Sequence, residues 1–274
     1  MLFAFQLLAR LPLWLLHGAG TVLGWMVFCL SPGYRRNFVA NAKQAGIVGS
    51  QWRAAVAGAG RLTLELPRLW LGRPVPVRWQ GADQVDVALA QGRGVVFITP
   101  HVGCFEVAAQ AYAQRFGASH PMTALYRPAR QPWLAALEPR ARARPGLLTA
   151  PTTTAGVRQM LRALHAGHCV GLLPDQVPPL GQGMWQPFFG KPAYTMTLSV
   201  RLAQMTGAAT LLAWGERLTW GRGYVVHVLP MPSLQGLDSA GALDALNRAL
   251  EQLVLQHSDQ YLWGYARYKQ PRSE

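Results

Sequence analysis

The sequence predicts an α/β fold, with a mostly parallel or mixed central sheet flanked by helices. Short apolar runs alternate with longer segments whose apolar residues recur at helical spacing. No internal repeat and no linker divides the chain, and 274 residues of which 50% are hydrophobic can bury one substantial core. We therefore expect a single α/β domain over residues 35–274, preceded by a hydrophobic N-terminal segment at residues 1–34.

The N-terminal segment is apolar enough to associate with a membrane. Residues 11–30 carry no formally charged side chain, and about 20 apolar residues can cross a bilayer. Arg10 precedes this run and Arg35 follows it, with further basic residues that favour a cytoplasmic location for the rest of the chain. Residues 2–9 lack the basic side chain of a secretory signal, so we expect an uncleaved membrane anchor. Because Pro12 and three glycines weaken the helix, it could span the bilayer, form a shallow hairpin or pack on the domain.

The elements of the domain follow from hydrophobic periodicity and from turn residues. Residues 35–71 are expected to form one or two helices that lead from the membrane to the domain. Beyond them, the expected strands cover residues 75–79, 95–99, 122–126, 169–173, 209–214 and 224–229. The expected helices cover residues 83–91, 105–115, 155–165, 198–205 and 242–256. This alternation is typical of helices packed on both faces of a sheet.

Charge and composition indicate anionic partners. The formal net charge is +14, while only 14% of residues are charged and ten are tryptophan. Nucleic acid, phospholipid headgroups, phosphorylated glycolipids and an acidic carrier protein all fit such a charge. The sequence has no helix-turn-helix, zinc or aromatic RNA-binding signature, which argues against nucleic acid. Tryptophan favours the membrane interface, and basic side chains are attracted to anionic lipid, so a membrane surface fits better.

The three cysteines give no sign of a disulfide framework or a structural zinc site. They are odd in number and show no CxxC spacing. We expect a reducing compartment, no metal and no cofactor.

The clearest chemical motif lies directly after the expected strand at residues 95–99. His101 follows that strand, and Glu106 comes five residues later, at the start of a helix. Five residues along a helix turn by about 500°, so His101 must lie in the turn, where Gly103 lets the two side chains approach. A neutral imidazole can deprotonate an alcohol as it attacks a carbonyl, while a carboxylate on the other ring nitrogen fixes the tautomer. We predict His101 as the general base and Glu106 as its partner, with no acyl-enzyme.

Other interpretations of this motif remain open on spacing alone. His101 could equally be a strand-end histidine bonded to backbone, with Glu106 solvated. A hydrolase using Cys104 is a further alternative, although the sequence lacks a G-x-S-x-G elbow. A non-catalytic basic protein that binds lipid or nucleic acid is the alternative of another class.

Further motifs extend this pattern over most of the chain from about residue 35. In chain order they are Tyr126-Arg127-Pro128, Arg142-Ala143-Arg144-Pro145-Gly146, Leu173-Pro174-Asp175-Gln176, Pro187-Phe188-Phe189-Gly190, Ala193-Tyr194-Thr195 and Gln260-Tyr261-Leu262-Trp263-Gly264-Tyr265-Ala266-Arg267-Tyr268-Lys269. Together with the histidine motif, the ordered set resembles the bacterial lipid A late acyltransferases. These lauroyl and myristoyl transferases are distant relatives of the glycerolipid acyltransferases, which share the H-x4-[DE] motif.

The resemblance implies a glycerolipid-acyltransferase-like fold and an enzyme at the cytoplasmic face of the inner membrane. Such an enzyme transfers an acyl chain from acyl carrier protein, or from acyl-CoA, to a hydroxyl of a lipid A precursor. It also implies that Arg144 and Asp175 lie near the active site. Arg127 and Arg142 would contact phosphate or the thioester carrier, with a structural role equally open for each.

The sequence also departs from the family. Arg130 and Gln131 stand where an asparagine is common. Another envelope lipid or an exported polyene glycolipid therefore remains an alternative acceptor.

Overall fold

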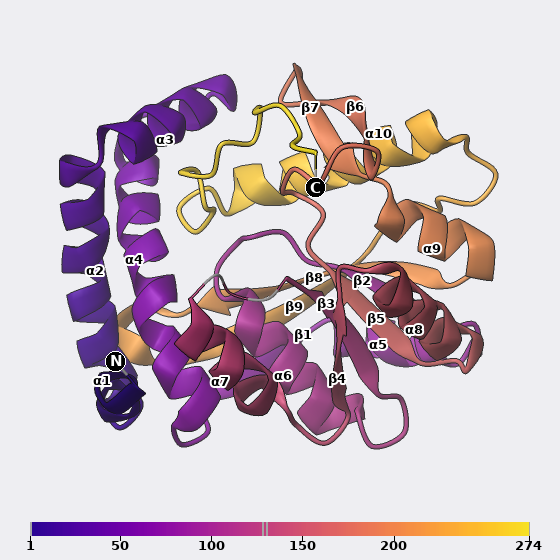
Figure 1. Ribbon diagram of the computed structural model, residues 1–274, viewed down its shortest axis with the longest axis horizontal. Coiled ribbons are helices and arrows are strands. Elements are labelled where there is room, and N and C mark those ends of the chain that lie inside the picture. The colour runs from indigo at the N-terminus through magenta and orange to yellow at the C-terminus, as the bar shows by residue number, and fades with distance from the viewer. Residues whose placement is uncertain (1, 128, 130, 274) are drawn as a thin grey trace.

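The computed structural model describes residues 2–127, 129 and 131–273 (Figure 1). Pro128 and Arg130, named above, lie outside the described residues. The helices are α1 (Leu2–Leu8), α2 (Leu13–Leu30), α3 (Pro32–Gln44), α4 (Ser50–Leu71), α5 (Ala82–Leu89), α6 (Phe105–Phe116), α7 (Pro132–Arg142), α8 (Thr154–His165), α9 (Leu198–Thr206) and α10 (Ser239–Gln256). The main-sheet strands are β1 (Val77–Gln80), β2 (Val95–Ile98), β3 (Met122–Tyr126), β4 (Leu147–Pro151), β5 (Cys169–Leu172), β8 (Ala209–Arg217) and β9 (Tyr224–Pro230). A separate hairpin pairs β6 (Gly183–Phe188) with β7 (Lys191–Met196).

The central sheet confirms the predicted α/β class. Its seven strands run in the order β1-β9-β8-β2-β5-β3-β4. All neighbours are parallel except β8 and β9, which are antiparallel. The carboxyl ends of β2 and β5 therefore meet at one edge of the sheet, where ligands bind in open α/β folds.

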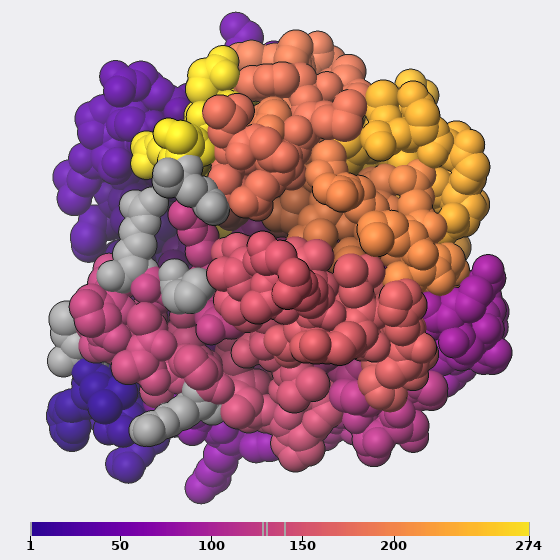
Figure 2. All heavy atoms as spheres, turned by 45° about the vertical axis from the view of Figure 1, so that its right-hand side comes forward, coloured from indigo at the N-terminus to yellow at the C-terminus, as the bar shows by residue number. Residues whose placement is uncertain are grey.

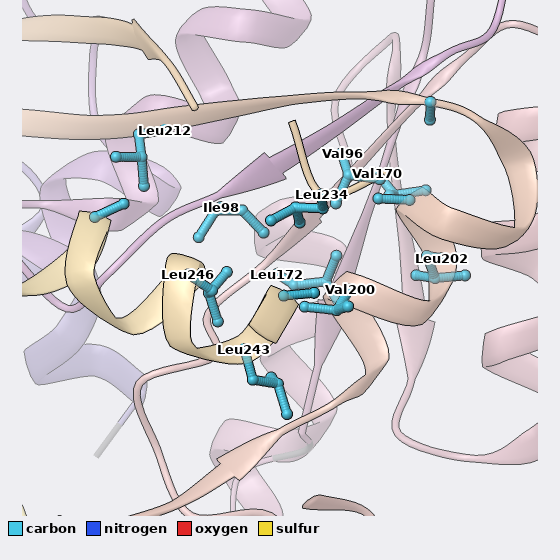
Figure 3. Packing of buried hydrophobic residues seen from close by; sticks show 14 of the residues in the cluster. Val96, Ile98, Val170, Leu172, Val200, Leu202, Leu212, Leu234, Leu243 and Leu246 are labelled. Atoms are coloured by element: carbon cyan, nitrogen blue, oxygen red, sulfur yellow. The ribbon is translucent and has the colours of Figure 1, made fainter. Parts of the chain in front are cut away.

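Helices cover both faces of the sheet, and the sheet separates the core into two layers. Val96 and Ile98 of β2 pack with α8, α9 and α10 on one face, and Figure 3 shows Leu246 of α10 close to this layer. Phe97 points to the other face, where it packs against Tyr112 of α6. Every residue of β2 is buried, because a central parallel strand is covered on both sides.

The N-terminal helices pack along one side of this domain (Figure 1). Helix α2 lies against α4, and one stripe of its residues is buried. A Cβ atom at Gly60 would lie 2.0 Å from the Gly20 carbonyl oxygen and 2.4 Å from the Gly24 nitrogen. These glycines therefore allow the two helix backbones to touch. In the space-filling view, the first residues form part of the surface at the lower left (Figure 2).

Helix α2 is the one described helix long and apolar enough to cross a membrane, with 33% of it buried. Residue 34, the expected end of the anchor, lies inside α3. The division of the chain at that residue stays a prediction.

Candidate active site

His101 is held in a turn that is fastened to neighbouring strands on both sides. The Thr99 backbone N–H donates to the Leu172 carbonyl of β5 at 2.9 Å, and the Cys104 N–H donates to the Gly215 carbonyl of β8 at 2.7 Å. Gly103 has φ +62°, and a Cβ atom there would lie 2.0 Å from the Gly215 oxygen. Only glycine fits this close approach in a left-handed conformation. Gly103 therefore shapes the turn, but it does not bring the side chains of His101 and Glu106 into contact as expected.

Asp175 is the carboxylate that orients the His101 ring. His101 Nδ1 lies 2.7 Å from Asp175 Oδ1, and the His101 backbone N–H donates to Oδ2 at 2.9 Å. The Asp175 side chain is 2% exposed and the His101 side chain 14%. Burial alone would raise the pKa of Asp175, but its interactions with His101 lower that pKa below the ordinary value. An ionised Asp175 therefore holds the proton of the imidazole on Nδ1.

The other ring nitrogen of His101 is left as an acceptor. Gln176 Nε2 lies 3.0 Å from His101 Nε2. An amide nitrogen can only donate, so Nε2 must carry the lone pair when Nδ1 carries the proton. This is the tautomer that a general base needs.

Glu106 has different partners from those expected. Glu106 Oε2 accepts from Trp70 Nε1 at 3.1 Å and from Arg142 Nε at 3.3 Å, and Arg142 also bonds Oε1. The predicted contact of Glu106 with the imidazole is therefore corrected, because Asp175 occupies Nδ1 and the first turn of α6 directs Glu106 to Arg142. Both His101 and Glu106 still line the same cavity. A catalytic role for Glu106 stays a prediction.

Arg142 lines the cavity next to Glu106, with which it is paired. Its guanidinium carbon is 5.2 Å from the centroid of the Trp70 ring, and its Nη1 is 3.7 Å from Glu138 Oε1. Burial would lower the pKa of Arg142, but the neighbouring Glu106 raises it. The side chain is 20% exposed and contributes to the cavity wall. A fixed positive charge thereby lines the same cavity as His101.

The two remaining arginines differ in position. Arg144 Nη1 donates to the carbonyls of Ala141 and Ala143, and its Nη2 donates to those of Leu69 and Trp70. These bonds tie the end of α7 to the end of α4, which is a structural role, and a substrate contact stays a prediction. Arg127 is exposed and lines the cavity just after β3.

A cavity of about 1080 Å³ opens beside the imidazole. Its wall continues along both faces of the sheet. Phe97, Ala109 and Tyr112 line the part under α6, while Leu172 and Leu202 line the part on the opposite face. The lining is mostly apolar with polar side chains among it, which is the usual character of a site that binds an apolar ligand.

A second buried charge pair supports the turn from behind. Arg217 of β8 bonds both carboxylate oxygens of Glu65 in α4, and its Nη2 donates to the Gly103 carbonyl at 3.1 Å. His17 Nε2 of α2 and the Tyr224 hydroxyl also reach Glu65 Oε2. Burial alone would raise the pKa of Glu65, but Arg217 and His17 lower it to about 2. Sequence spacing gave no signal for this cluster, whose members come from four separate elements.

Cys104 is unsuited to act as a nucleophile. It is fully buried, and burial raises the pKa of its thiol well above the ordinary value. A reactive cysteine needs the opposite, a lowered pKa and access to substrate. Among the described residues, no group of three or more His, Cys, Asp or Glu could hold a metal ion.

Comparison with known proteins identifies the family of this chain. The chain is 27% identical over 217 residues to the lipid A biosynthesis lauroyltransferase of Escherichia coli K12. The matched region is 77% of this chain and 69% of that protein. The chain is also 27% identical over 191 residues to the lipid A biosynthesis palmitoleoyltransferase of the same organism, covering 69% of this chain and 60% of that protein. The model of the bacterial lipid A biosynthesis acyltransferases matches residues 56–270. The chain therefore belongs to the bacterial lipid A biosynthesis acyltransferase family.

Proposed function

We propose that this chain transfers a fatty acyl group from an acyl thioester to a hydroxyl of a lipid A precursor. Acyl carrier protein is the proposed donor, with acyl-CoA as the alternative. The observation that carries this proposal is the His101–Asp175 pair, whose imidazole lines a large and mostly apolar cavity. The names of the family and of its relatives supply the substrate class.

The proposed chemistry is direct transfer. His101 Nε2 takes the proton of the acceptor hydroxyl as its oxygen attacks the thioester carbonyl. Asp175 stabilises the imidazolium that forms, because it is ionised and bonded to Nδ1. Collapse of the tetrahedral intermediate breaks the carbon–sulfur bond, and the imidazolium returns its proton to the thiolate. No acyl-enzyme is formed, in agreement with the inert environment of Cys104.

Arg142 is proposed to stabilise negative charge during transfer. Its guanidinium faces the same cavity as His101, and Glu106 fixes its orientation. A positioned cation or donor at a developing oxyanion lowers the barrier most when it needs no reorganisation. Glu106 would then act through Arg142, as a positioning residue. Arg127, exposed at the same cavity, is proposed to contact a phosphate of the acceptor or an acidic carrier.

The proposed place of action is the cytoplasmic face of the inner membrane. An acceptor with several acyl chains leaves a bilayer at high cost, since exposure of each methylene group costs about 0.8 kcal/mol. The apolar N-terminal helices and the net charge of +14 suit an enzyme that works at an anionic lipid surface.

The direct test is product analysis. The purified full chain is incubated with acyl carrier protein that carries a labelled acyl chain and with a phosphorylated, partly acylated lipid A precursor. The lipids are then analysed by mass spectrometry. We expect one additional acyl chain per acceptor and release of one carrier thiol. Transfer only to another envelope lipid or to a polyene glycolipid would replace the acceptor named here. Lipid binding without any thiol release would contradict an enzymatic function.

A further inference from the structure

Helix α2 carries an apolar face that the rest of the described chain leaves uncovered. Trp14, Val22 and Leu30 are 61%, 63% and 75% exposed, and no charged residue occurs between Leu11 and Leu30. Large apolar patches on a monomer usually mark a binding surface. The opposite face of α2 is buried against α4, so the helix has one buried face and one exposed apolar face.

The buried side of α2 is attached to polar groups that cannot follow it into a bilayer. His17 bonds Glu65, and Thr21 accepts a hydrogen bond from Arg61 Nε at 3.0 Å. Glu65 is in turn paired with Arg217 of the central sheet. A span by α2 would either break these bonds or place α4, with Arg61 and Glu65, inside the hydrocarbon. Both charged side chains are costly at that depth.

A second element reaches the same surface. Trp220, in the turn between β8 and β9, is 86% exposed and adopts φ +59°. A non-glycine residue in this conformation is strained, and its ring gains no packing within the described chain in return. The turn touches the start of α2, because a Cβ atom at Gly221 would lie 2.3 Å from the Trp14 nitrogen. Two exposed tryptophans thus belong to adjoining backbone segments.

The chain that precedes Glu65 carries formal charge of one sign. The first acidic residue of the chain is the buried Glu65, and six basic residues precede it. These residues are Arg10, Arg35, Arg36, Lys43, Arg53 and Arg61. Arg35 donates to the Cys29 carbonyl at the end of α2. Arg10 precedes the first residue of α2 by three positions, and Arg222 follows Trp220 by two. Basic side chains beside an apolar, tryptophan-containing face complement an anionic lipid surface.

We infer that α2 lies in the plane of the membrane interface, and that α2 and the Trp220 turn together dock the enzyme on an anionic phospholipid bilayer without crossing it. This inference extends the proposed function by naming the surface that faces the lipid. Because it concerns binding alone, it can be tested without donor or acceptor, and failure of acyl transfer would leave its outcome readable.

Depth measurements distinguish lying from spanning. Leu15, Val22 or Leu30 is replaced by a single cysteine in a Cys29→Ser background, and that cysteine is spin-labelled. Each labelled variant is then studied on vesicles of phosphatidylcholine and phosphatidylglycerol. The buried Cys104 and Cys169 need no replacement. We expect all three labels at a similar depth, about 5–10 Å below the headgroups. A spanning helix would instead put Val22 near the bilayer centre and the other two, about 22 Å apart along the axis, at opposite interfaces, which would overturn the inference.

The role of the Trp220 turn is tested by vesicle partition. Trp220→Ser should weaken binding to the anionic vesicles by about tenfold. The matched control is Trp185→Ser, at a residue 43% exposed on the β6–β7 hairpin, which should change binding by less than about twofold. Equal binding by wild type and Trp220→Ser would refute the inference. The inference would also be refuted if the protein formed a concentration-dependent dimer that covers this surface and did not bind the vesicles.

Discussion

Both carboxylate oxygens of Asp175 are engaged by a single residue, His101, which lies 74 positions earlier in the chain. Oδ2 accepts from the His101 backbone N–H and Oδ1 contacts the ring, so backbone and imidazole are fixed relative to each other. Asp175 is buried and His101 is partly buried, and the two residues follow the parallel neighbouring strands β5 and β2. This arrangement sets the tautomer of the proposed base before substrate arrives.

Replacement of Asp175 by Asn should reduce turnover without removing the fold. Asn can still accept one hydrogen bond but cannot stabilise an imidazolium, so we expect kcat to fall by about 10²–10⁴-fold with little change in KM. Thiol release from the acyl carrier measures this effect. Asp244→Asn, which removes a surface carboxylate paired with Arg248, is the control and should retain wild-type activity. Comparable kcat values for Asp175→Asn and wild type would argue against Asp175 as the orienting group.

Glu106 and Arg142 should behave as a coupled pair. Glu106→Gln leaves Arg142 partly buried without its main charge partner, which should lower the free energy of unfolding by about 3–5 kcal/mol. Glu138→Gln should cost less, because Glu138 is 3.7 Å from the same guanidinium. Denaturant unfolding measures both, and kcat/KM of Glu106→Gln, Arg142→Gln and the double variant gives the coupling in catalysis. Strictly additive losses in kcat/KM would show that Glu106 does not act through Arg142.

Glu65 should make folding stability depend on pH in the acid range. Its pKa is about 2 in the folded protein against an ordinary value of 4.5, so the folded state favours the ionised form. The stability contributed by this shift is present above pH 4.5 and is lost as pH falls toward 2. Glu65→Gln should be less stable at pH 7, and the difference from wild type should shrink over this interval. A difference that stays constant from pH 6 to pH 2.5 would contradict the assigned ion pair with Arg217.

Acyl chain length should respond to the cavity wall. Ala109 of α6 is half-buried and lines the cavity, so Ala109→Phe places a ring where the acyl chain is proposed to lie. We expect the ratio of kcat/KM for a 16-carbon over a 12-carbon donor to fall by about tenfold or more. Ala40→Phe, at an exposed position on α3, is the control for added bulk. An unchanged ratio in Ala109→Phe would place the acyl chain elsewhere.

Much of the fold follows from hydrophobic pattern alone. The strand predicted at residues 122–126 is β3, and the apolar runs that predicted β2 and β5 each differ from the structure by one residue. Helix α7, strand β4 and the β6–β7 hairpin escaped prediction. Proline explains two of these misses, because Pro139 lies inside α7 and Pro187 pairs with Pro192 across the hairpin. Proline in a helix or strand usually argues against either, and here tertiary packing overrides that preference.

The contacts of the predicted site residues differ from those that sequence spacing suggested. His101 contacts Asp175 and Glu106 contacts Arg142, whereas spacing paired His101 with Glu106, the nearest acid in sequence. The correct partner follows β5, which a linear pattern does not show to be the neighbour of β2. A signal was nevertheless present, since Asp175 follows a buried strand just as His101 does. Acidic residues after two such strands can meet when the strands are parallel neighbours.

In the proposed reaction, the His101 ring itself removes the acceptor proton. The test of this step is thiol release from acyl carrier protein, measured in the presence of acceptor for wild type and for His101→Ala. The two proteins are first shown to unfold at the same temperature. We expect the rate to be about 10²–10⁴-fold lower for the variant. Equal rates for the two proteins would contradict this role of the ring.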